Sequence, residues 1–231
     1  MSDSIESRLV QVNARVAAAC KRAGREPAQV TVLPVSKTFD ANVIRQAVAA
    51  GLTRFGENKT QEIRRKAQEL NDLDLDWVLI GHLQTNKAKD AARFVSEVQS
   101  LDRLSLAQAL DQRLQQEGRA IDVLVQVKTS PEPSKFGLDP DELPSFLKQL
   151  ASFQTLRVKG LMTLAVNSPD IKAVRSCFKA LRLCRDRLQD VGYAELTRLS
   201  MGMSGDFELA IEEGATEVRI GSAIFGQRDY A

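Results

Sequence analysis

The chain has 231 residues, of which 43% are hydrophobic and 27% charged, and its formal net charge at pH 7 is +2. This size and composition are typical of one globular domain, residues 1–231, and the small net charge gives no reason to expect nucleic acid or a membrane surface as a partner. The start MSDSIESRLV lacks the features of a secretory signal, and no apolar run approaches the about 20 residues of a transmembrane helix.

Short apolar runs alternate along the chain with longer segments whose apolar residues have helical spacing. A helix is predicted over residues 4–23, before the first run. The predicted strands cover residues 30–37, 53–57, 76–82, 97–102, 121–128, 157–165, 196–202 and 217–226. The predicted helices between them cover residues 41–52, 58–70, 85–95, 103–118, 139–153, 168–192 and 205–215.

This alternation predicts an α/β protein, specifically a (β/α)₈ TIM barrel with an extra N-terminal helix. An open doubly wound sheet produces the same alternation and remains the alternative fold. Pro34 lies inside the first predicted strand. It argues weakly against a central strand there, because proline has no amide hydrogen to donate to a neighbouring strand.

Lys37 ends the first predicted strand, in the stretch VTVLPVSKTFD. The carboxyl ends of barrel strands form the active face, and alternation along the strand places Leu33, Val35 and Lys37 on the side of the barrel interior. Partial burial there lowers the pKa of a lysine amine and favours Schiff-base formation with a carbonyl. The alternative is a lysine that reaches solvent or pairs with a carboxylate such as Glu57.

Two glycine-bearing segments lie near the end of the chain: SMGMSGDFELA follows the seventh predicted strand, and RIGSAIFG closes the eighth. Barrels of this kind frequently bind phosphate with the loops after strands seven and eight. Glycine allows close approach of the backbone to a phosphate, and the hydroxyls of Ser204 and Ser222 add hydrogen-bond donors. Each of these glycine-bearing turns alone is a weak signal, but together they predict a phosphate site.

For other polar residues in or near the predicted strand ends, the sequence leaves both a functional and a structural role open. His82 is the single histidine of the sequence and lacks neighbours at metal-ligand spacing, so it is an acid or base or a structural residue. Asn58 contacts a ligand or caps the next helix. Arg219, inside the eighth strand, pairs with an acid or faces a ligand. The basic run at residues 64–66 is predicted to be a solvated helix face.

A reactive lysine and a phosphate site in one barrel fit a ligand that is both an aldehyde and a phosphate ester. Pyridoxal 5′-phosphate (PLP) is one such ligand. The substrate of a Schiff-base aldolase that acts on sugar phosphates is another, and the residues alone leave both open.

The sequence resembles the pyridoxal phosphate homeostasis proteins, which are single-domain relatives of the alanine racemase barrel. The resemblance extends from VSK to IFGQR. The segments that carry it are VSKTF, RFGEN, IGHLQTNK, SKFGL, GLMTLA and LSMGMSGDFELAIEEGATEVRIGSAIFG. The last of these is long enough to make chance agreement remote.

This resemblance implies that PLP is held as a Schiff base on Lys37, and that Arg219 faces its pyridine nitrogen. An arginine there disfavours protonation of the ring and weakens the cofactor as an electron sink. The two glycine-bearing turns would hold the phosphate. The full set of expected cofactor-binding residues is Lys37, Asn58, His82, Met201, Ser204, Gly205, Arg219, Gly221 and Ser222.

The chain departs from the family pattern at two places. Members usually read WHFIG where this chain reads WVLIG, so Val78 replaces a histidine. Many read GENY where Lys59 stands here. The role of the missing histidine is therefore open for this protein, whereas the lysine and the phosphate turns are present.

A racemase of this barrel type needs two bases on opposite faces of the substrate carbon. Alanine racemase takes the second from an extra domain of its partner subunit, for which this chain is too short. Its two tyrosines, Tyr193 and Tyr230, are poorly placed for that role. We therefore predict a monomeric carrier without enzymatic activity that binds PLP reversibly and passes it to apoenzymes. The alternative is a PLP-dependent amino acid racemase or decarboxylase.

The cysteines give an indication of the compartment. Cys20, Cys177 and Cys184 are an odd number without ligand-like spacing. Such a set is typical of free thiols in a reducing environment, so we expect the protein in the cytoplasm.

Overall fold

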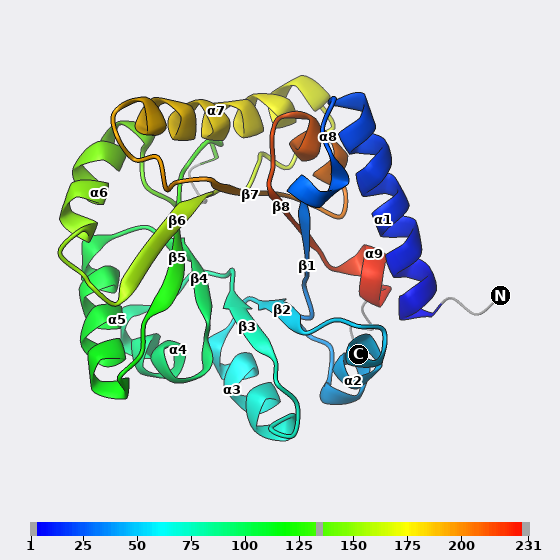
Figure 1. Cartoon of the computed structure of the whole chain (residues 1–231), viewed down its shortest axis with the longest axis horizontal. Helices are drawn as coiled ribbons and strands as arrows, with labels where there is room; N and C mark the ends of the chain where they lie inside the picture. Colours follow the sequence, from blue (N-terminus) through cyan, green and yellow to red (C-terminus); the bar gives the residue numbers. More distant parts are fainter. Residues whose placement is uncertain (1–3, 133–135, 228–231) are drawn as a thin grey trace.

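The computed structural model describes residues 4–132 and 136–227, and it shows eight parallel strands with helices packed around them (Figure 1). In the sheet each strand lies beside its neighbours in chain order, and β1 also pairs with β8. A bridge between Val35 and Gly56 joins β1 to β2 and nearly closes the barrel. The strands are β1 (Thr31–Pro34), β2 (Arg54–Glu57), β3 (Asp76–Leu79), β4 (Glu97–Leu101), β5 (Ile121–Gln126), β6 (Leu156–Met162), β7 (Arg198–Met203) and β8 (Glu217–Ile220).

Helices connect successive strands and form the outer layer, as in a (β/α)₈ barrel. The first helix, α1, precedes β1, so the predicted fold with its extra N-terminal helix is confirmed. The α-helices are α1 (Ile5–Arg22), α2 (Ala41–Ala49), α3 (Thr60–Glu69), α4 (Ala88–Phe94), α5 (Leu104–Glu117), α6 (Leu143–Leu150), α7 (Ile171–Asp190), α8 (Phe207–Glu212) and α9 (Ser222–Phe225). Short 3₁₀ turns lie at η1 (Pro27–Gln29), η2 (Thr85–Lys87) and η3 (Pro140–Glu142).

Local signals in the sequence account for several helix boundaries. Asp40 precedes α2, and its side chain accepts a hydrogen bond from the backbone N of Val43 at 3.0 Å. Asp170 caps α7 in the same way through the backbone N of Lys172. Gly118 ends α5 with a φ of +63°, a conformation that glycine adopts without strain. These capped ends set where the chain turns back toward the strands.

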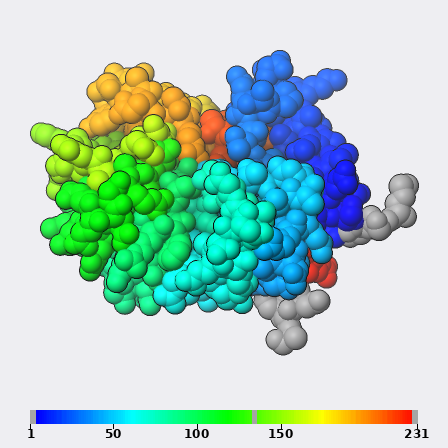
Figure 2. Space-filling model, turned by 60° about the horizontal axis from the view of Figure 1, so that its bottom comes forward, coloured from blue at the N-terminus to red at the C-terminus, as the bar shows by residue number. Residues whose placement is uncertain are grey.

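The strands contribute alternate side chains to two layers. Trp77 and Leu79 of β3 belong to the large apolar core between strands and helices, whereas the residue between them, Val78, faces the barrel interior. Helix α1 packs against α8 and α9, which brings the beginning of the chain beside its last two β/α units. Figure 2 shows these segments together, with blue atoms next to orange and red ones. This packing supports the barrel from outside near β8.

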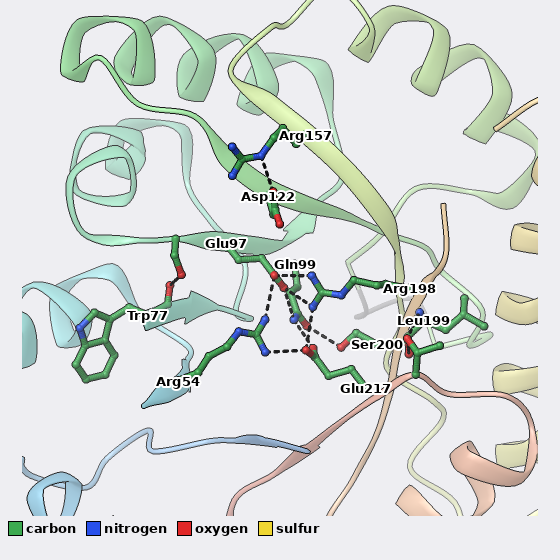
Figure 3. A network of polar contacts seen from close by, with 12 residues as sticks. Arg54, Trp77, Glu97, Gln99, Asp122, Arg157, Arg198, Leu199, Ser200 and Glu217 are labelled. Carbon is green, nitrogen blue, oxygen red and sulfur yellow. Dashed lines mark hydrogen bonds and ion pairs between the residues drawn. The ribbon is translucent and has the colours of Figure 1, made fainter. Parts of the chain in front are cut away.

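A network of charged side chains fills the amino end of the barrel (Figure 3). Arg54, Glu97, Arg198 and Glu217 are the first residues of their strands, and each arginine contacts both glutamates at N–O distances of 2.6 to 2.9 Å. The amide nitrogen of Gln99 donates to both glutamates as well. The charges of this floor network are balanced, and its polar atoms have partners within the protein.

All eight strands are shorter in the structure than in the sequence prediction, and the first and the eighth differ most. The first ends at Pro34, and Val35 then continues the pairing, since its backbone N donates to the oxygen of Ile220 at 2.8 Å. The proline therefore lies at a strand end, where its missing amide is tolerated. The eighth strand ends at Ile220, because residues 222–225 form α9. Within the described part of the chain, none of the helices combines the length and apolar character needed to cross a bilayer.

Candidate functional site

A cavity of about 570 Å³ opens at the carboxyl end of the strands. This volume is in the range of small-molecule sites, and the carboxyl end is where barrel enzymes bind their ligands. All the candidate residues except Met201 line it, namely Lys37, Asn58, His82, Ser204, Gly205, Arg219, Gly221 and Ser222. The structure thus brings together residues from the ends of β1, β2, β3, β7 and β8.

Lys37 lies in a turn just after β1, in which the backbone N of Phe39 donates to the oxygen of Ser36 at 3.1 Å. Lys37 and Val35 both line the cavity, which agrees with the predicted alternation. Glu57, which the sequence offered as an ion-pair partner for Lys37, pairs with Lys66 instead. It is fully buried and bonds the Nζ of Lys66 at 2.6 Å.

The prediction that residues 64–66 form a solvated helix face is wrong for Lys66. Arg64 and Arg65 are exposed, but the side chain of Lys66 is 0% exposed. Its Nζ also donates to the backbone oxygen of Ser36, at 2.9 Å. Burial raises the pKa of Glu57 to about 7 and outweighs the opposing effect of the Lys66 charge.

The turns after β7 and β8 lie against each other. The hydroxyl of Ser204, after β7, accepts a hydrogen bond from the backbone N of Gly221, after β8, at 3.2 Å. At Gly202 the φ angle is +92°, and a Cβ there would lie 2.5 Å from the Cβ of Ala210. Only glycine fits this position, so α8 packs directly on β7 and the Ser204 turn is held beside the cavity.

Arg219 enters the cavity from inside the barrel and is 3% exposed. Its guanidinium donates to the hydroxyl of Ser200 at 2.7 Å and to the backbone oxygen of Thr163 at 2.8 Å. Burial lowers its pKa to about 10. Both of these hydrogen-bond partners are neutral groups, so the guanidinium is fixed in place without a bonded carboxylate and presents positive charge to the cavity.

His82 and Asn58 form another part of the cavity wall. The His82 ring stacks on Phe136, with centroids 3.9 Å apart, and its Nδ1 lies 3.6 Å from a carboxylate oxygen of Asp102. Asn58 does not cap α3, because Lys59 is the N-cap residue. A Cβ at Gly81 would lie 2.2 Å from the backbone oxygen of Asn58, so these two strand ends approach as closely as glycine permits.

Met201 is the one candidate that the structure places away from the cavity. It is fully buried, and it belongs to the core beneath the helices. The preceding residue, Ser200, points into the barrel and bonds Gln99 and Arg219, so Met201 faces the other side of β7. Met203, beyond an irregularity in the β7–β8 pairing, lines the cavity instead.

The cavity also includes residues that the sequence did not single out, among them Gln126, Phe136 and Leu164. Gln126 is the last residue of β5, so the sequence could have indicated it as a site residue because it is polar and lies at a strand end. Its side-chain nitrogen donates to the backbone oxygen of Phe136 at 3.0 Å. Val78, which replaces the family histidine, lies in the barrel interior and does not line the cavity.

Some residues considered from the sequence fall outside this site. Tyr193 lies in the connection that leads into β7, so it is near the amino end of the barrel, opposite the cavity. Tyr230, together with Ser134 and Lys135 of the SKFGL segment, lies outside the described residues. Among residues 4–132 and 136–227, no three His, Cys, Asp or Glu side chains are grouped so that they could hold a metal ion.

Comparison with known proteins agrees with this arrangement. The model of the alanine racemase N-terminal domain matches residues 8–229. A pyridoxal phosphate homeostasis protein from Aquifex aeolicus is 43% identical over 223 residues, which cover 96% of this chain and 98% of that protein. One from Pseudomonas aeruginosa is 43% identical over 227 residues, covering 98% and 97% of the two chains.

A solved structure shows the same similarity. PipY from Synechococcus elongatus PCC7942, a COG0325 family member solved with PLP bound, superposes with a TM-score of 0.85 at 38% identity. The match covers 96% of this chain and 100% of that one. The family resemblance that the sequence motifs indicated is therefore confirmed.

Proposed function

The chain belongs to the family of pyridoxal phosphate homeostasis proteins, and we propose that it binds PLP in the cavity at the carboxyl end of its barrel. The observation that carries this proposal is that one cavity contains Lys37, Arg219 and both glycine-bearing turns. A PLP molecule has an aldehyde, a ring nitrogen and a phosphate, and each of these groups has a matching partner there.

The residues present fit each part of the cofactor. A Cβ at Gly221 would lie 3.3 Å from the backbone oxygen of Val35, so a larger residue would crowd the floor of the turn that we assign to the phosphate. Ser204, Gly205 and Ser222 offer hydroxyl and backbone groups beside it. Arg219 keeps positive charge at the ring position, where an unprotonated pyridine nitrogen can accept a hydrogen bond.

Lys37 would hold the aldehyde as a Schiff base. Its amine would be the nucleophile, and the C=N bond would form with loss of one water. Addition of water to that bond regenerates the amine and releases PLP, so no oxidant or reductant is needed. A site that only binds and releases in this way stores a reactive aldehyde and delivers it to apoenzymes.

We favour the carrier over a racemase or another PLP enzyme. Racemisation needs a second base across the cavity from Lys37. Tyr193 lies at the other end of the barrel, and Arg219 would keep the ring unprotonated and thus a weaker electron sink. We further propose that residues 1–231 act as one domain, as a monomer, in the cytoplasm.

The visible spectrum tests the proposal. Wild type and Lys37→Ala are each loaded with PLP and dialysed, and the absorbance of the Schiff base is recorded. We expect the band in wild type and its loss in Lys37→Ala. A colourless wild type would refute PLP binding, and a band retained by the variant would place the Schiff base on another lysine. Turnover of an amino acid by loaded wild type, above that of free PLP, would refute the carrier.

A further inference from the structure

Three charged residues of β2 and α3 hold the turn that carries Lys37, although none of them lines the cavity. These residues are Glu57, Glu62 and Lys66. They form a cluster, since Lys66 Nζ lies 2.6 Å from a carboxylate oxygen of Glu57 and 3.6 Å from one of Glu62. Glu57 and Lys66 are fully buried, and Glu62 is partly exposed. We call these three residues the Lys66 cluster.

The cluster bonds the residues on both sides of Lys37. Before it, the backbone oxygen of Ser36 accepts from Lys66 at 2.9 Å, and the Ser36 hydroxyl donates to Glu57 at 2.7 Å. After it, the backbone N of Thr38 donates to Glu62 at 3.1 Å. The direction in which the backbone presents Lys37 is therefore fixed by contacts at the preceding and the following residue.

The turn itself is strained. Thr38 has a φ of +73°, and it is the one residue other than glycine with a positive φ among the described residues. For a β-branched residue this conformation costs on the order of 1–3 kcal/mol, and it persists only where the surroundings impose it. The hydrogen bond from Thr38 to Glu62 is one such constraint.

The composition of the cluster is poorly suited to a purely stabilising role. Burial of an ion pair is costly, and well-packed apolar residues are often as stable or more so. Here the second carboxylate oxygen of Glu57 is buried without a hydrogen-bond partner. To satisfy that oxygen, a proton must be shared with the neighbouring carboxyl of Glu62, which makes the cluster a costly way to fill the space between α3 and the barrel.

We propose that Lys66 is a positioning residue for Lys37: together with Glu57 and Glu62 it fixes the turn at residues 36–39, so that the Lys37 amine points at the aldehyde of a ligand whose phosphate is held by the turns after β7 and β8. This inference rests on the proposed PLP binding. It predicts that the cluster controls Schiff-base formation and leaves the contacts to phosphate and ring unchanged.

The test compares two ligands that share these contacts. Pyridoxine 5′-phosphate has an alcohol in place of the aldehyde, so it cannot form the Schiff base. For Lys66→Met we expect PLP binding to weaken about tenfold or more, because small displacements of a reacting group have large effects. Binding of pyridoxine 5′-phosphate should stay within about twofold of wild type. Arg65→Met, an exposed neighbour on α3, serves as the matched control with both ligands unchanged.

A second variant distinguishes the loss of positioning from misfolding caused by an unpaired buried charge. Lys66→Met leaves Glu57 buried without its cation, so Glu57→Gln/Lys66→Met removes both charges and avoids an unpaired one. Because it also lacks the bond to Ser36, it should show the same selective loss of PLP binding. Glu62→Ala, which alters the less buried end of the cluster, should show a smaller loss of the same kind.

The outcomes separate this inference from the proposed function. If wild type forms no Schiff-base band, PLP binding itself is wrong. If wild type forms the band and the Lys66 variants bind PLP equally well, only the positioning role is wrong. An equal loss for both phosphates would also overturn it, since that result indicates a general distortion of the site.

Discussion

Both ends of this barrel contain buried charges, but the two ends differ in how these charges are compensated. At the amino end, Arg54 and Arg198 each contact both Glu97 and Glu217. At the carboxyl end, Arg219 is hydrogen-bonded to neutral groups, and one oxygen of Glu57 is buried without a hydrogen-bond partner. The acids and arginines of the floor network neutralise one another within the protein, whereas Arg219 faces the cavity without a bonded carboxylate.

This difference indicates that the charges at the amino end stabilise the fold, whereas that of Arg219 at the carboxyl end serves ligand binding. The balanced floor network fixes the starts of β2, β4, β7 and β8, and its polar groups are already bonded within the protein rather than available to a ligand. A charged group in a cleft without a bonded countercharge is typical of functional sites, because a ligand can supply the missing contact. This applies to Arg219, which lines the cavity, and not to Glu57, which does not. Variants at the two ends should therefore differ in whether unfolding or ligand binding changes.

The largest effect on stability is expected at the floor. Arg198→Met leaves Glu97 and Glu217 with one arginine between them, and breaking a buried pair in this way costs on the order of 3–5 kcal/mol. Urea unfolding of wild type and variant measures the loss. Arg157→Met is the control, because the Arg157–Asp122 pair is largely exposed and such pairs contribute about 0–1 kcal/mol. Equal losses in the two variants would contradict the special role of the floor.

A pH-dependent effect is expected at the mouth. The pKa of Glu57 is raised from 4.5 to about 7 in the folded protein. The folded state therefore keeps a proton that the unfolded state has lost, and stability from this group is present below pH 4.5 and lost as the pH rises through 7. The loss is about 3 kcal/mol. The free energy of unfolding of wild type, minus that of Glu57→Gln, should fall by this amount between pH 4.5 and 7.5.

Titrating groups that do not interact with Glu57 are common to both proteins and cancel in the difference. A difference that stays flat would mean that Glu57 has an ordinary pKa in the folded state. A rise would mean that Lys66 and Ser36 stabilise its ionised form more than burial opposes it.

A smaller effect, on binding, is expected for Arg219→Met. The variant removes the charge that we assign to the ring nitrogen, and loss of one hydrogen bond to a charged group weakens binding by about 2 kcal/mol, or roughly thirtyfold. Spectroscopic titration with PLP measures this change. Unlike Arg198→Met, the variant leaves no carboxylate without its partner, so its unfolding midpoint should change less. If Arg219→Met unfolded easily but bound PLP normally, Arg219 would serve stability rather than binding, contrary to the difference expected between the two ends.

Much of the fold and the site could be predicted because both follow strand periodicity. Lys37, Ser204 and Gly221 lie at or near the carboxyl ends of predicted strands, and a parallel barrel brings strand ends together. Met201 was expected among the cofactor-binding residues from the family resemblance, but it faces the core, and Met203 reaches the cavity beyond the irregular pairing between β7 and β8. One residue of shift moves a side chain to the opposite face.

The buried Lys66 and the floor network were missed for different reasons. Ile63, Lys66 and Leu70 have the spacing of one helix face, so the periodicity of α3 contained a signal that Lys66 is buried. The charge of the lysine argued against that reading. The floor network gave no local signal, because Arg54 and Glu217 are 163 residues apart and meet only when the barrel closes.

The bridge between Val35 and Gly56 gives this barrel a seam. The structure records this one residue pair between β1 and β2, whereas every other neighbouring strand pair has at least two. Local opening is least costly where the fewest ladder contacts break. The seam lies two residues before Lys37, so transient breathing of the barrel should begin beside the lysine. An opening of this kind would expose the Lys37 side of the cavity while the rest of the barrel stays folded.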